Sequence, residues 1–282
     1  MINFAHVVAM LMLACFARPT SPPAASPRQL HVPILMYHYI SANPAWPNDT
    51  VRTNLSVPPP AFAAQLEYLQ HAGYTTISLG DMVSALNGGA TLPDKPIVLT
   101  FDDGYQDFYD NAYPLLKHYG DHATIYIISH DVDRPGYMTW DELRELATSP
   151  LITIGAHTRT HPDLSRLKVV DSWDEMAGSK TDLENQLGIV VRDIAYPSGR
   201  YSPTVLDQAG EIGFATGVTT REGQDETPGV LLALPRIRVN GYTSIDDLIA
   251  GLQGRRSLHA RRYRRPAPPL LGGMRARLAL GN

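Results

Sequence analysis

The strongest constraint on the fold is a repeated alternation of short apolar runs with stretches of helical periodicity. The first run, residues 32–37, is continuously apolar, as expected for a strand covered on both faces. A helical stretch opens at the prolines 58–60, and the glycine at position 73 ends it. The same criteria predict strands at 75–79, 96–101, 123–128, 151–154, 215–218 and 237–239 and near Ile194. They predict further helices at 81–86, 108–119, 140–147, 173–187 and 203–209.

These alternating units have short connections, which predicts an α/β fold with a parallel sheet under helices. The number of units is large enough for the sheet to curl into a barrel. In such folds the functional side chains gather on loops at the carboxyl ends of the strands. Four candidate groups fall there: His38, Asp102 with Asp103, His157 with His161, and the stretch 196–199. Their shared placement predicts one site at one rim of the sheet.

The charge is distributed unevenly along the 282 residues. The net charge is −4, but residues 254–282 hold eight arginines and no acid, which leaves 16 basic and 28 acidic residues elsewhere, or −12. A body with that charge is a poor candidate for binding nucleic acid. The basic tail, 254–282, is expected to be flexible and solvated. The alternative is that it docks on an anionic polymer or membrane surface.

The N-terminus suggests export. Residues 7–16 are apolar and precede a Pro/Ser/Ala-rich stretch, a pattern too short to span a bilayer but typical of a signal peptide, although no Lys or Arg precedes it. The single cysteine, Cys15, could accept a lipid, with residues 18–27 as a tether; the alternative is cleavage after Ala17. We therefore expect a location in the periplasm, at the outer membrane or at the cell surface. The expected division is 1–29 as signal and tether, 30–253 as the folded domain, and 254–282 as the tail.

Two adjacent carboxylates follow the apolar run 96–101. Like charges repel, so either Asp102 or Asp103 should resist ionisation unless a cation or a hydrogen-bond donor lies close by. Successive side chains of a strand point to opposite faces, so the two can share a site only where the strand breaks, and Gly104 supplies that break. The alternative is a turn in which the aspartates bond to their own backbone.

Two histidines four residues apart, His157 and His161, follow the predicted strand at 151–154. On a turn of helix limited by Pro162, His157 and His161 would share a face and could meet one ion. The pair alone is also compatible with coincidence. Together with a carboxylate it predicts a catalytic site for Zn²⁺, or for another divalent metal such as Co, Ni or Fe. One aspartate would then bind the metal, while the other takes a proton from water held there.

These motifs resemble those of the polysaccharide deacetylases with a NodB-like domain, carbohydrate esterase family four. The resemblance rests on TFDDG and HTRTH, about 55 residues apart, and covers roughly residues 33–252. It implies a distorted (β/α) barrel with fewer than eight units. It also implies that Asp102 is the catalytic base and that Asp103, His157 and His161 are the metal ligands.

Later motifs of the family fit less well. The R-x-P-[YF] motif aligns with 195–199, so Ala195 replaces the arginine that orients the base, and Ser198 would supply the backbone N–H that stabilises the oxyanion. The L-x-H motif aligns with residues 234–236, so Arg236 replaces the general-acid histidine, and arginine holds its proton too tightly for that role. The family's aspartate–tryptophan motif is not visible beyond Trp173.

Three stretches, 33–40, 196–199 and 235–237, resemble the exported deacetylases that act on poly-β-1,6-N-acetylglucosamine, a biofilm polysaccharide. In the catalytic scheme, His38 is a candidate to protonate the departing amine, and the alternative is a structural histidine bonded to backbone. Tyr196 and Pro197 are candidates to line the sugar site; for the tyrosine, simple packing is the alternative.

The predicted function is metal-dependent removal of N-acetyl groups from a hexosamine polysaccharide, such as a poly-N-acetylglucosamine-like or chitin-like polymer or peptidoglycan. Two other functions fit the same residues. One is hydrolysis of O-acetyl esters on a polysaccharide such as xylan. The other is glycan binding without catalysis, which the replaced arginine and histidine would favour. The pattern predicts no particular oligomeric state.

Overall fold

The computed structural model describes residues 30–42, 49–226 and 228–255. The expected signal peptide with Cys15, and all but the first two residues of the expected basic tail, lie outside these residues. Within the described part, no helix is both long enough and apolar enough to cross a bilayer.

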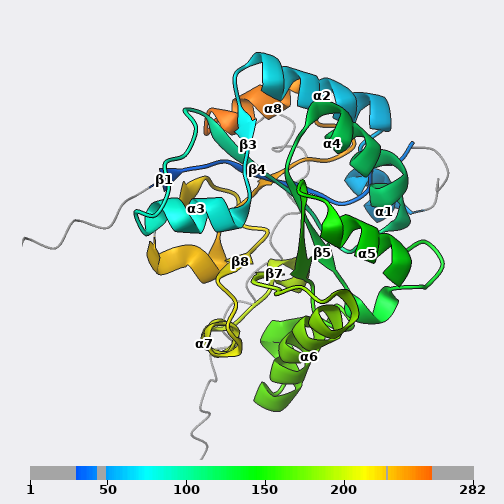
Figure 1. The fold of residues 1–282 in the computed structure, drawn as a ribbon, viewed down its shortest axis with the longest axis vertical. Helices are drawn as coiled ribbons and strands as arrows, with labels where there is room; N and C mark the ends of the chain where they lie inside the picture. Colours follow the sequence, from blue (N-terminus) through cyan, green and yellow to red (C-terminus); the bar gives the residue numbers. More distant parts are fainter. Residues whose placement is uncertain (1–29, 43–48, 227, 256–282) are drawn as a thin grey trace, which may run out of the picture.

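The centre of the fold is a parallel sheet whose strands follow one another around a curl (Figure 1). The strand order is β10-β2-β4-β5-β6-β7-β8, and β3 pairs with β4 beside this path. Every pairing in the sheet is parallel. The strands are β2 (Ile34–Tyr37), β3 (Thr75–Thr76), β4 (Pro96–Phe101), β5 (Ala123–Ile127), β6 (Ile152–Ala156), β7 (Asp193–Ala195), β8 (Thr216–Val218) and β10 (Ile237–Arg238). The remaining strands, β1 (Leu30–His31) and β9 (Asp225–Glu226), form an antiparallel pair.

One short segment touches both ends of the curled sheet. Leu234 forms a parallel bridge with Val218 at the β8 edge. Three residues later, Ile237 and Arg238 pair with Leu35 and Met36 of β2 at the opposite edge. The segment 234–238 therefore spans the gap between the first and last strands of the sheet.

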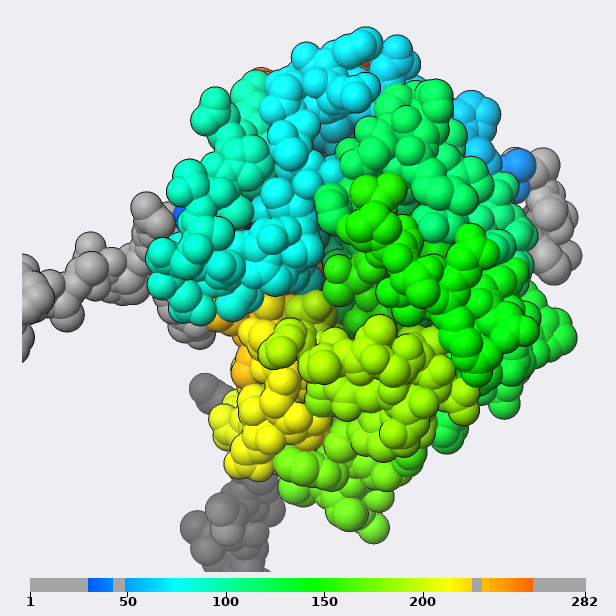
Figure 2. Space-filling model, in the orientation of Figure 1, coloured from blue at the N-terminus to red at the C-terminus, as the bar shows by residue number. Residues whose placement is uncertain are grey.

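Helices cover the outside of the sheet, and their side chains hide most of it in the view of Figure 2. They are α1 (Thr50–Leu55), α2 (Pro59–His71), α3 (Leu79–Leu86), α4 (Tyr113–Tyr119), α5 (Trp140–Thr148), α6 (Val169–Leu187), α7 (Pro203–Ile212) and α8 (Ile245–Leu252). A π-helical turn, η1 (Phe108–Ala112), leads into α4, and short 3₁₀ turns occur at η2 (Ser129–Asp131), η3 (Leu164–Arg166), η4 (Pro197–Gly199) and η5 (Pro228–Ala233).

The alternation of side chains along the strands produces two apolar clusters. Leu35, Leu99 and Ile125 belong to the larger cluster, which includes buried residues of most of the helices, although those of α3 belong to the smaller cluster. Ile34 and Val98, one position away in their strands, belong to a smaller cluster with residues of β7 and β8. Strands buried on both faces explain why the sequence shows continuous apolar runs there.

The predicted α/β fold, a curled sheet with fewer than eight β/α units, is confirmed. Strand β4 has the predicted limits, and the other predicted helices and strands overlap observed ones. The largest differences are that β3 has two residues rather than five, and that α6 begins four residues before the predicted start at Trp173.

Candidate metal centre and active site

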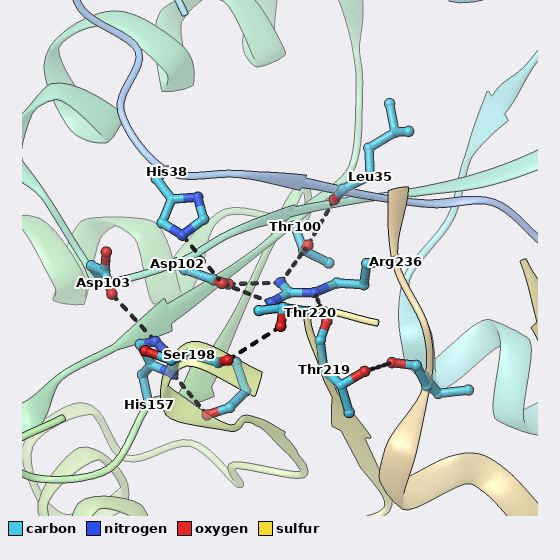
Figure 3. A network of polar contacts seen from close by, with 12 residues as sticks. Leu35, His38, Thr100, Asp102, Asp103, His157, Ser198, Thr219, Thr220 and Arg236 are labelled. Carbon is cyan, nitrogen blue, oxygen red and sulfur yellow. Dashed lines mark hydrogen bonds and ion pairs between the residues drawn. The ribbon is translucent and has the colours of Figure 1, made fainter. Parts of the chain in front are cut away.

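The carboxyl ends of the central strands bring the predicted polar residues together. His38 follows β2, Asp102 and Asp103 follow β4, and His157 follows β6. Figure 3 shows these side chains converging at one rim of the sheet, beside Ser198. Residues that are far apart in the chain thus meet as the strand order requires.

Asp103, His157 and His161 form a cluster whose ligand atoms all lie within 4.8 Å of one another. The Nε2 atoms of His157 and His161 lie 3.2 and 3.6 Å from the same carboxylate oxygen of Asp103. The other nitrogen of His157, Nδ1, lies 2.7 Å from the backbone oxygen of Ala195, which favours the tautomer that leaves Nε2 free to bind a cation. Two imidazoles and one carboxylate, with open positions, fit a catalytic divalent metal.

The pKa of each residue in this cluster depends on burial and on the charges of its neighbours. Burial lowers the pKa of His157, but the hydrogen bond to Asp103 and the charges of both aspartates outweigh burial and raise the pKa above its ordinary value. Burial and the neighbouring His157 lower the pKa of His161. Burial raises the pKa of Asp103, but the hydrogen bond and charge of His157 reverse this effect and lower the pKa. The carboxylate is therefore ionised at neutral pH.

The two histidines do not lie on a turn of helix, so that prediction is wrong. The segment between them is a loop in which Thr158 and His161 have φ values of 65° and 59°. The His161 N–H donates to Thr158 Oγ1 at 3.0 Å, and the two imidazole centroids lie 4.8 Å apart. Left-handed backbone in the loop brings the rings together where the prediction relied on helical spacing.

Left-handed backbone is concentrated at this rim. Among the described residues other than glycine, five have positive φ, and four of them are Asp103, Thr158, His161 and Ser198. Non-glycine residues rarely adopt this conformation, and such strain accumulates at functional sites. The backbone therefore marks the same place as the side chains.

Asp102 is held by a buried arginine from the far end of the chain. Arg236, which is 0% exposed, donates from both terminal nitrogens to the two oxygens of Asp102, each at 2.7 Å. Its Nε donates to the Thr219 carbonyl at 2.8 Å, and one terminal nitrogen also donates to Thr100 Oγ1 at 3.0 Å. Burial raises the pKa of Asp102, but Arg236 outweighs burial and holds the pKa well below its usual range.

The expectation that a base-orienting arginine is missing needs correction. Ala195 does stand at the position of the family's arginine, and its side chain belongs to the smaller apolar cluster. Arg236, which the motif alignment treated as a failed general acid, instead makes the bidentate contact with Asp102. The sequence held one indication of this contact. Arg236 lies within the short segment 234–239, part of which was predicted to be a strand, and a buried arginine needs an acidic partner.

His38 faces the same carboxylate. Its side chain is 11% exposed, and its Nε2 lies 3.8 Å from Oδ2 of Asp102. Its Nδ1 is buried and has no hydrogen-bond partner in the described structure, so the alternative of a histidine bonded to backbone is not observed. Burial lowers the pKa of His38 despite the nearby charges of Asp102 and Asp103.

At the turn η4, two of the predicted site residues, Tyr196 and Pro197, are buried, and the third, Ser198, is exposed. Tyr196 is 0% exposed within the larger apolar cluster, and Pro197 is also buried, so the prediction that they line the sugar site does not fit their positions. Ser198 is exposed and has a φ of 55°. A Cβ on Gly199 would lie 2.2 Å from Thr220 Oγ1, so this turn requires glycine there.

Comparison with known proteins identifies the family of this chain. The family model described as polysaccharide deacetylase matches residues 89–217. The polysaccharide deacetylase-like protein YxkH of Bacillus subtilis is 35% identical over 209 residues, which are 74% of this chain and 71% of that protein. The poly-β-1,6-N-acetyl-D-glucosamine N-deacetylase of Escherichia coli is 34% identical over 119 residues, which are 37% of this chain but only 18% of that enzyme.

Solved structures show the same architecture. The Streptococcus pyogenes deacetylase PplD, in complex with acetate, has a TM-score of 0.73 and 35% identity, and the match covers 80% of this chain and 99% of that one. A polysaccharide deacetylase from Bacillus cereus has a TM-score of 0.70 and 28% identity, with 79% and 69% of the chains covered. From its motifs, its rim of strand-end residues and these relatives, the chain belongs to the polysaccharide deacetylase family, carbohydrate esterase family four.

Proposed function

We propose that this enzyme removes N-acetyl groups from a hexosamine polysaccharide, such as poly-N-acetylglucosamine, a chitin-like polymer or peptidoglycan, and releases acetate and a free amine. The observation that carries the proposal is the placement of an ionised carboxylate, Asp102, next to the three-residue cluster of Asp103, His157 and His161. The N-acetyl specificity is supported by relatives that are named poly-β-1,6-N-acetyl-D-glucosamine N-deacetylases.

Asp103, His157 and His161 would hold the cation, with zinc as the first candidate. A divalent cation at this position supplies Lewis acidity, which polarises an acetyl carbonyl and lowers the pKa of water. The chain itself supplies the proton acceptor, Asp102. Because Arg236 holds both oxygens of that carboxylate, Asp102 keeps one orientation and stays ionised throughout the working pH range.

His38 provides a path for the proton to the departing amine. The proton that Asp102 accepts from the attacking water can pass to His38, whose Nε2 lies 3.8 Å from Oδ2 of Asp102, with a small movement of the His38 ring. His38 is neutral in the free enzyme at neutral pH because burial lowers its pKa, so it can accept this proton. It then donates the proton to the amine as the carbon–nitrogen bond breaks, and both groups return to their starting states.

Ser198 is the proposed donor to the oxyanion. Its backbone N–H lies in the turn after β7, and this residue, unlike Tyr196 and Pro197, is exposed at the rim. A well-placed donor to an oxyanion contributes on the order of 3 kcal/mol to transition-state stabilisation. The left-handed φ of Ser198 is the kind of strained conformation that surrounding structure maintains at functional sites.

The test combines metal content with acetate release. The purified protein, its Asp103→Ala variant and its Asp102→Asn variant would be loaded with Zn²⁺ and assayed on N-acetylglucosamine oligomers and on acetylated xylan. We expect Asp103→Ala to lose both metal and activity. Asp102→Asn leaves buried Arg236 without its anionic partner and should be less stable. At a temperature where circular dichroism shows this variant to be folded, it should keep metal but lose activity. Full activity in Asp103→Ala would exclude the proposed centre.

The same assay separates the alternatives. Faster acetate release from xylan than from the amide substrates would identify an O-acetyl esterase. Glycan binding without acetate release from any substrate would identify a binding protein; this alternative has lost one of its supports, because Arg236 supplies the arginine that Ala195 lacks.

We further propose that the protein is exported, with residues 1–29 as signal and tether. The support is the apolar run 7–16 and the Pro/Ser/Ala-rich stretch that follows it. Mass spectrometry of the mature N-terminus tests this proposal. A lipidated Cys15 at the new terminus would show a lipoprotein, cleavage after Ala17 would show a soluble exported form, and an intact Met1 would contradict export.

A further inference from the structure

The loop that carries the two candidate histidine ligands is fastened to helix α6 by Arg159. The Arg159 guanidinium lies between two aspartates that are eight residues apart on α6. Its Nε and one terminal nitrogen donate to the two oxygens of Asp182 at 3.0 and 3.2 Å. The other terminal nitrogen donates to both oxygens of Asp174, at 2.9 and 3.1 Å. One side chain between His157 and His161 is thus fixed at two points of the helix.

A third acid of α6 binds the backbone of the same loop. Oε2 of Glu175 accepts hydrogen bonds from the backbone N–H groups of Arg159 and Thr160, both at 2.9 Å. Its Oε1 accepts a hydrogen bond from Thr160 Oγ1 at 2.6 Å. The backbone between the two histidines is therefore held by charge-assisted hydrogen bonds, which are stronger than neutral ones.

Helix α6 has a glycine where the arginine crosses it. A Cβ on Gly178 would lie 2.2 Å from Cζ and 2.3 Å from Nε of Arg159, and the three atoms nearest to that Cβ all belong to this arginine. Glycine inside a helix is destabilising by roughly 0.5–1 kcal/mol relative to alanine. The Arg159 guanidinium occupies the space where a side chain at position 178 would lie, so only glycine fits there without moving the arginine.

The opposite side of the loop is held by η2. The backbone N–H groups of Ser129 and His130 donate to the carbonyls of Thr158 and Arg159, at 3.2 and 3.0 Å. The hydroxyl of Ser129 also donates to Asp182 at 3.0 Å. The loop is therefore bonded to both η2 and α6, and Asp182 of α6 accepts hydrogen bonds from Ser129 of η2 and from Arg159 of the loop.

This support matters because the loop is not regular secondary structure. Thr158 and His161 are left-handed, a conformation that persists only where the surroundings impose it. We propose that Arg159, with Asp174, Glu175 and Asp182, positions His157 and His161 for the cation; we call these four residues the α6 clamp. The proposal rests on the metal centre proposed above, and Arg159 acts as a positioning residue that does not touch the cation.

The solvent exposure of the clamp indicates whether it affects the stability of the fold or the affinity for metal. The side chains of Arg159 and Asp182 are 26% and 28% exposed, and that of Asp174 is 69% exposed. Ion pairs this open to solvent contribute little to the stability of a fold. In contrast, mutation of the groups that support metal ligands typically weakens metal binding by about 10- to 100-fold. The clamp should therefore act on metal affinity rather than on unfolding of the metal-free protein.

The test measures the affinity of the metal-free protein for Zn²⁺, by competition with a chromophoric chelator, together with its melting temperature. We expect Arg159→Ala to weaken Zn²⁺ binding by about 10- to 100-fold while the metal-free melting temperature changes little. The matched control is Arg144→Gln on α5, which removes another exposed arginine bonded to an aspartate, Asp141 at 2.6 Å. This control should bind Zn²⁺ like the wild type.

Gly178→Ala tests the same clamp without altering any of its charges. The new methyl group displaces the Arg159 guanidinium, so Zn²⁺ binding should weaken, while the metal-free protein should be no less stable because alanine favours the helix. In the Arg159→Ala background, the Gly178→Ala change should have no further effect on Zn²⁺ affinity.

Three results would overturn the inference. Wild-type Zn²⁺ affinity in Arg159→Ala would show that the clamp does not position the histidines. An undiminished effect of Gly178→Ala in the Arg159→Ala background would show that the glycine acts by another route. Absence of Zn²⁺ binding by the wild type would remove the metal centre itself, a failure distinct from the first two.

Discussion

Asp102 and Arg236 are separated by 134 positions in the chain, yet they form two parallel hydrogen bonds of 2.7 Å in the interior. The arginine is 0% exposed and the aspartate 3% exposed. A buried ion pair adds little net stability, but removal of one partner leaves an uncompensated charge and is strongly destabilising. This pair therefore links the orientation of the proposed base to the integrity of the fold.

Replacing Arg236 by methionine should destabilise the protein by about 3–5 kcal/mol at pH 7, because the Asp102 charge is left buried without a partner. The effect should depend on pH. With Arg236 present, the folded-state pKa of Asp102 lies below the unfolded value of about 3.9, so the pair stabilises the fold above that pH, and this contribution is lost as pH falls through the folded pKa. In the variant, burial without the arginine raises the pKa of Asp102, so the carboxyl takes up a proton near pH 4 and avoids most of the cost of an unpaired charge. Urea unfolding should therefore show the largest difference between the proteins at pH 7 and a smaller one near pH 4.

The control for this prediction is the double variant Asp102→Asn/Arg236→Met. Removing the charge together with its partner should recover much of the lost stability at pH 7, although not the activity. An Arg236→Met protein as stable as the wild type at pH 7 would mean that Asp102 is not ionised in the folded protein.

His38→Gln should lower the turnover of N-acetylated substrate by about 10²- to 10⁴-fold, the usual contribution of a general acid–base group. Its Zn²⁺ content should be unchanged, because His38 does not belong to the cluster of candidate ligands. Acetate release and metal analysis on the same sample check both expectations. The exposed His118→Gln on α4 is the matched control and should behave like the wild type. Unchanged turnover in His38→Gln would assign the proton transfer to another group.

Asp107→Asn should stabilise the protein at pH 7.5 by on the order of 2 kcal/mol. Burial raises the pKa of Asp107 to about 6, although Ser41 and the backbone of Ile40 pull the pKa down. Well below pH 4 the group is neutral in both states and has no effect. As pH rises from 4 to 6 the unfolded chain ionises first, which destabilises the fold, and the full effect persists above pH 6.

Chemical unfolding of both proteins at pH 3 and pH 7.5 measures this difference, which should be close to zero at the lower pH. Asp110→Asn, an exposed aspartate on the same turn, should change stability by less than about 0.5 kcal/mol at either pH. A destabilising Asp107→Asn at pH 7.5 would indicate that the charged form makes favourable contacts in the folded protein.

Tyr196→Phe tests the correction that Tyr196 packs in the core and does not line the sugar site. Its hydroxyl is buried without a hydrogen-bond partner in the described structure, so its removal should leave stability unchanged or raise it by up to about 1 kcal/mol. KM should not change. The matched control is Tyr37→Phe, which removes a hydrogen bond of 3.0 Å to Gln65 and should destabilise by about 1 kcal/mol or more. A raised KM in Tyr196→Phe would return the tyrosine to the substrate site.

The sequence predicted the parts of this protein that depend on local pattern. Strand β4 and helix α2 were predictable because apolar periodicity, proline and glycine act within a few residues. The grouping of Asp103, His157 and His161 was predictable because strands of a parallel sheet end at a common rim.

The remaining features depend on contacts between distant residues. Arg236 could not be assigned to Asp102 from spacing alone, because the pairing exists only when the segment 234–238 lies against β2. The conformation of the His157–His161 loop depends on α6, which supplies charges outside the motif. Tyr196 looked like a candidate sugar contact because it adjoins Pro197 and Ser198. Its burial results from the larger apolar cluster, to which it belongs, and from the Tyr201 ring, whose centroid lies 5.3 Å from its own.

The position of the segment 234–238 late in the chain bears on the order in which the parts of the active site form during synthesis. Leu234 joins the β8 edge, Ile237 and Arg238 join β2, and Arg236 between them reaches Asp102. During synthesis, the candidate ligands Asp103, His157 and His161 leave the ribosome well before this segment does. A nascent chain can therefore assemble its cation-binding residues early, but its base acquires its partner only when the last stretch of sheet is in place.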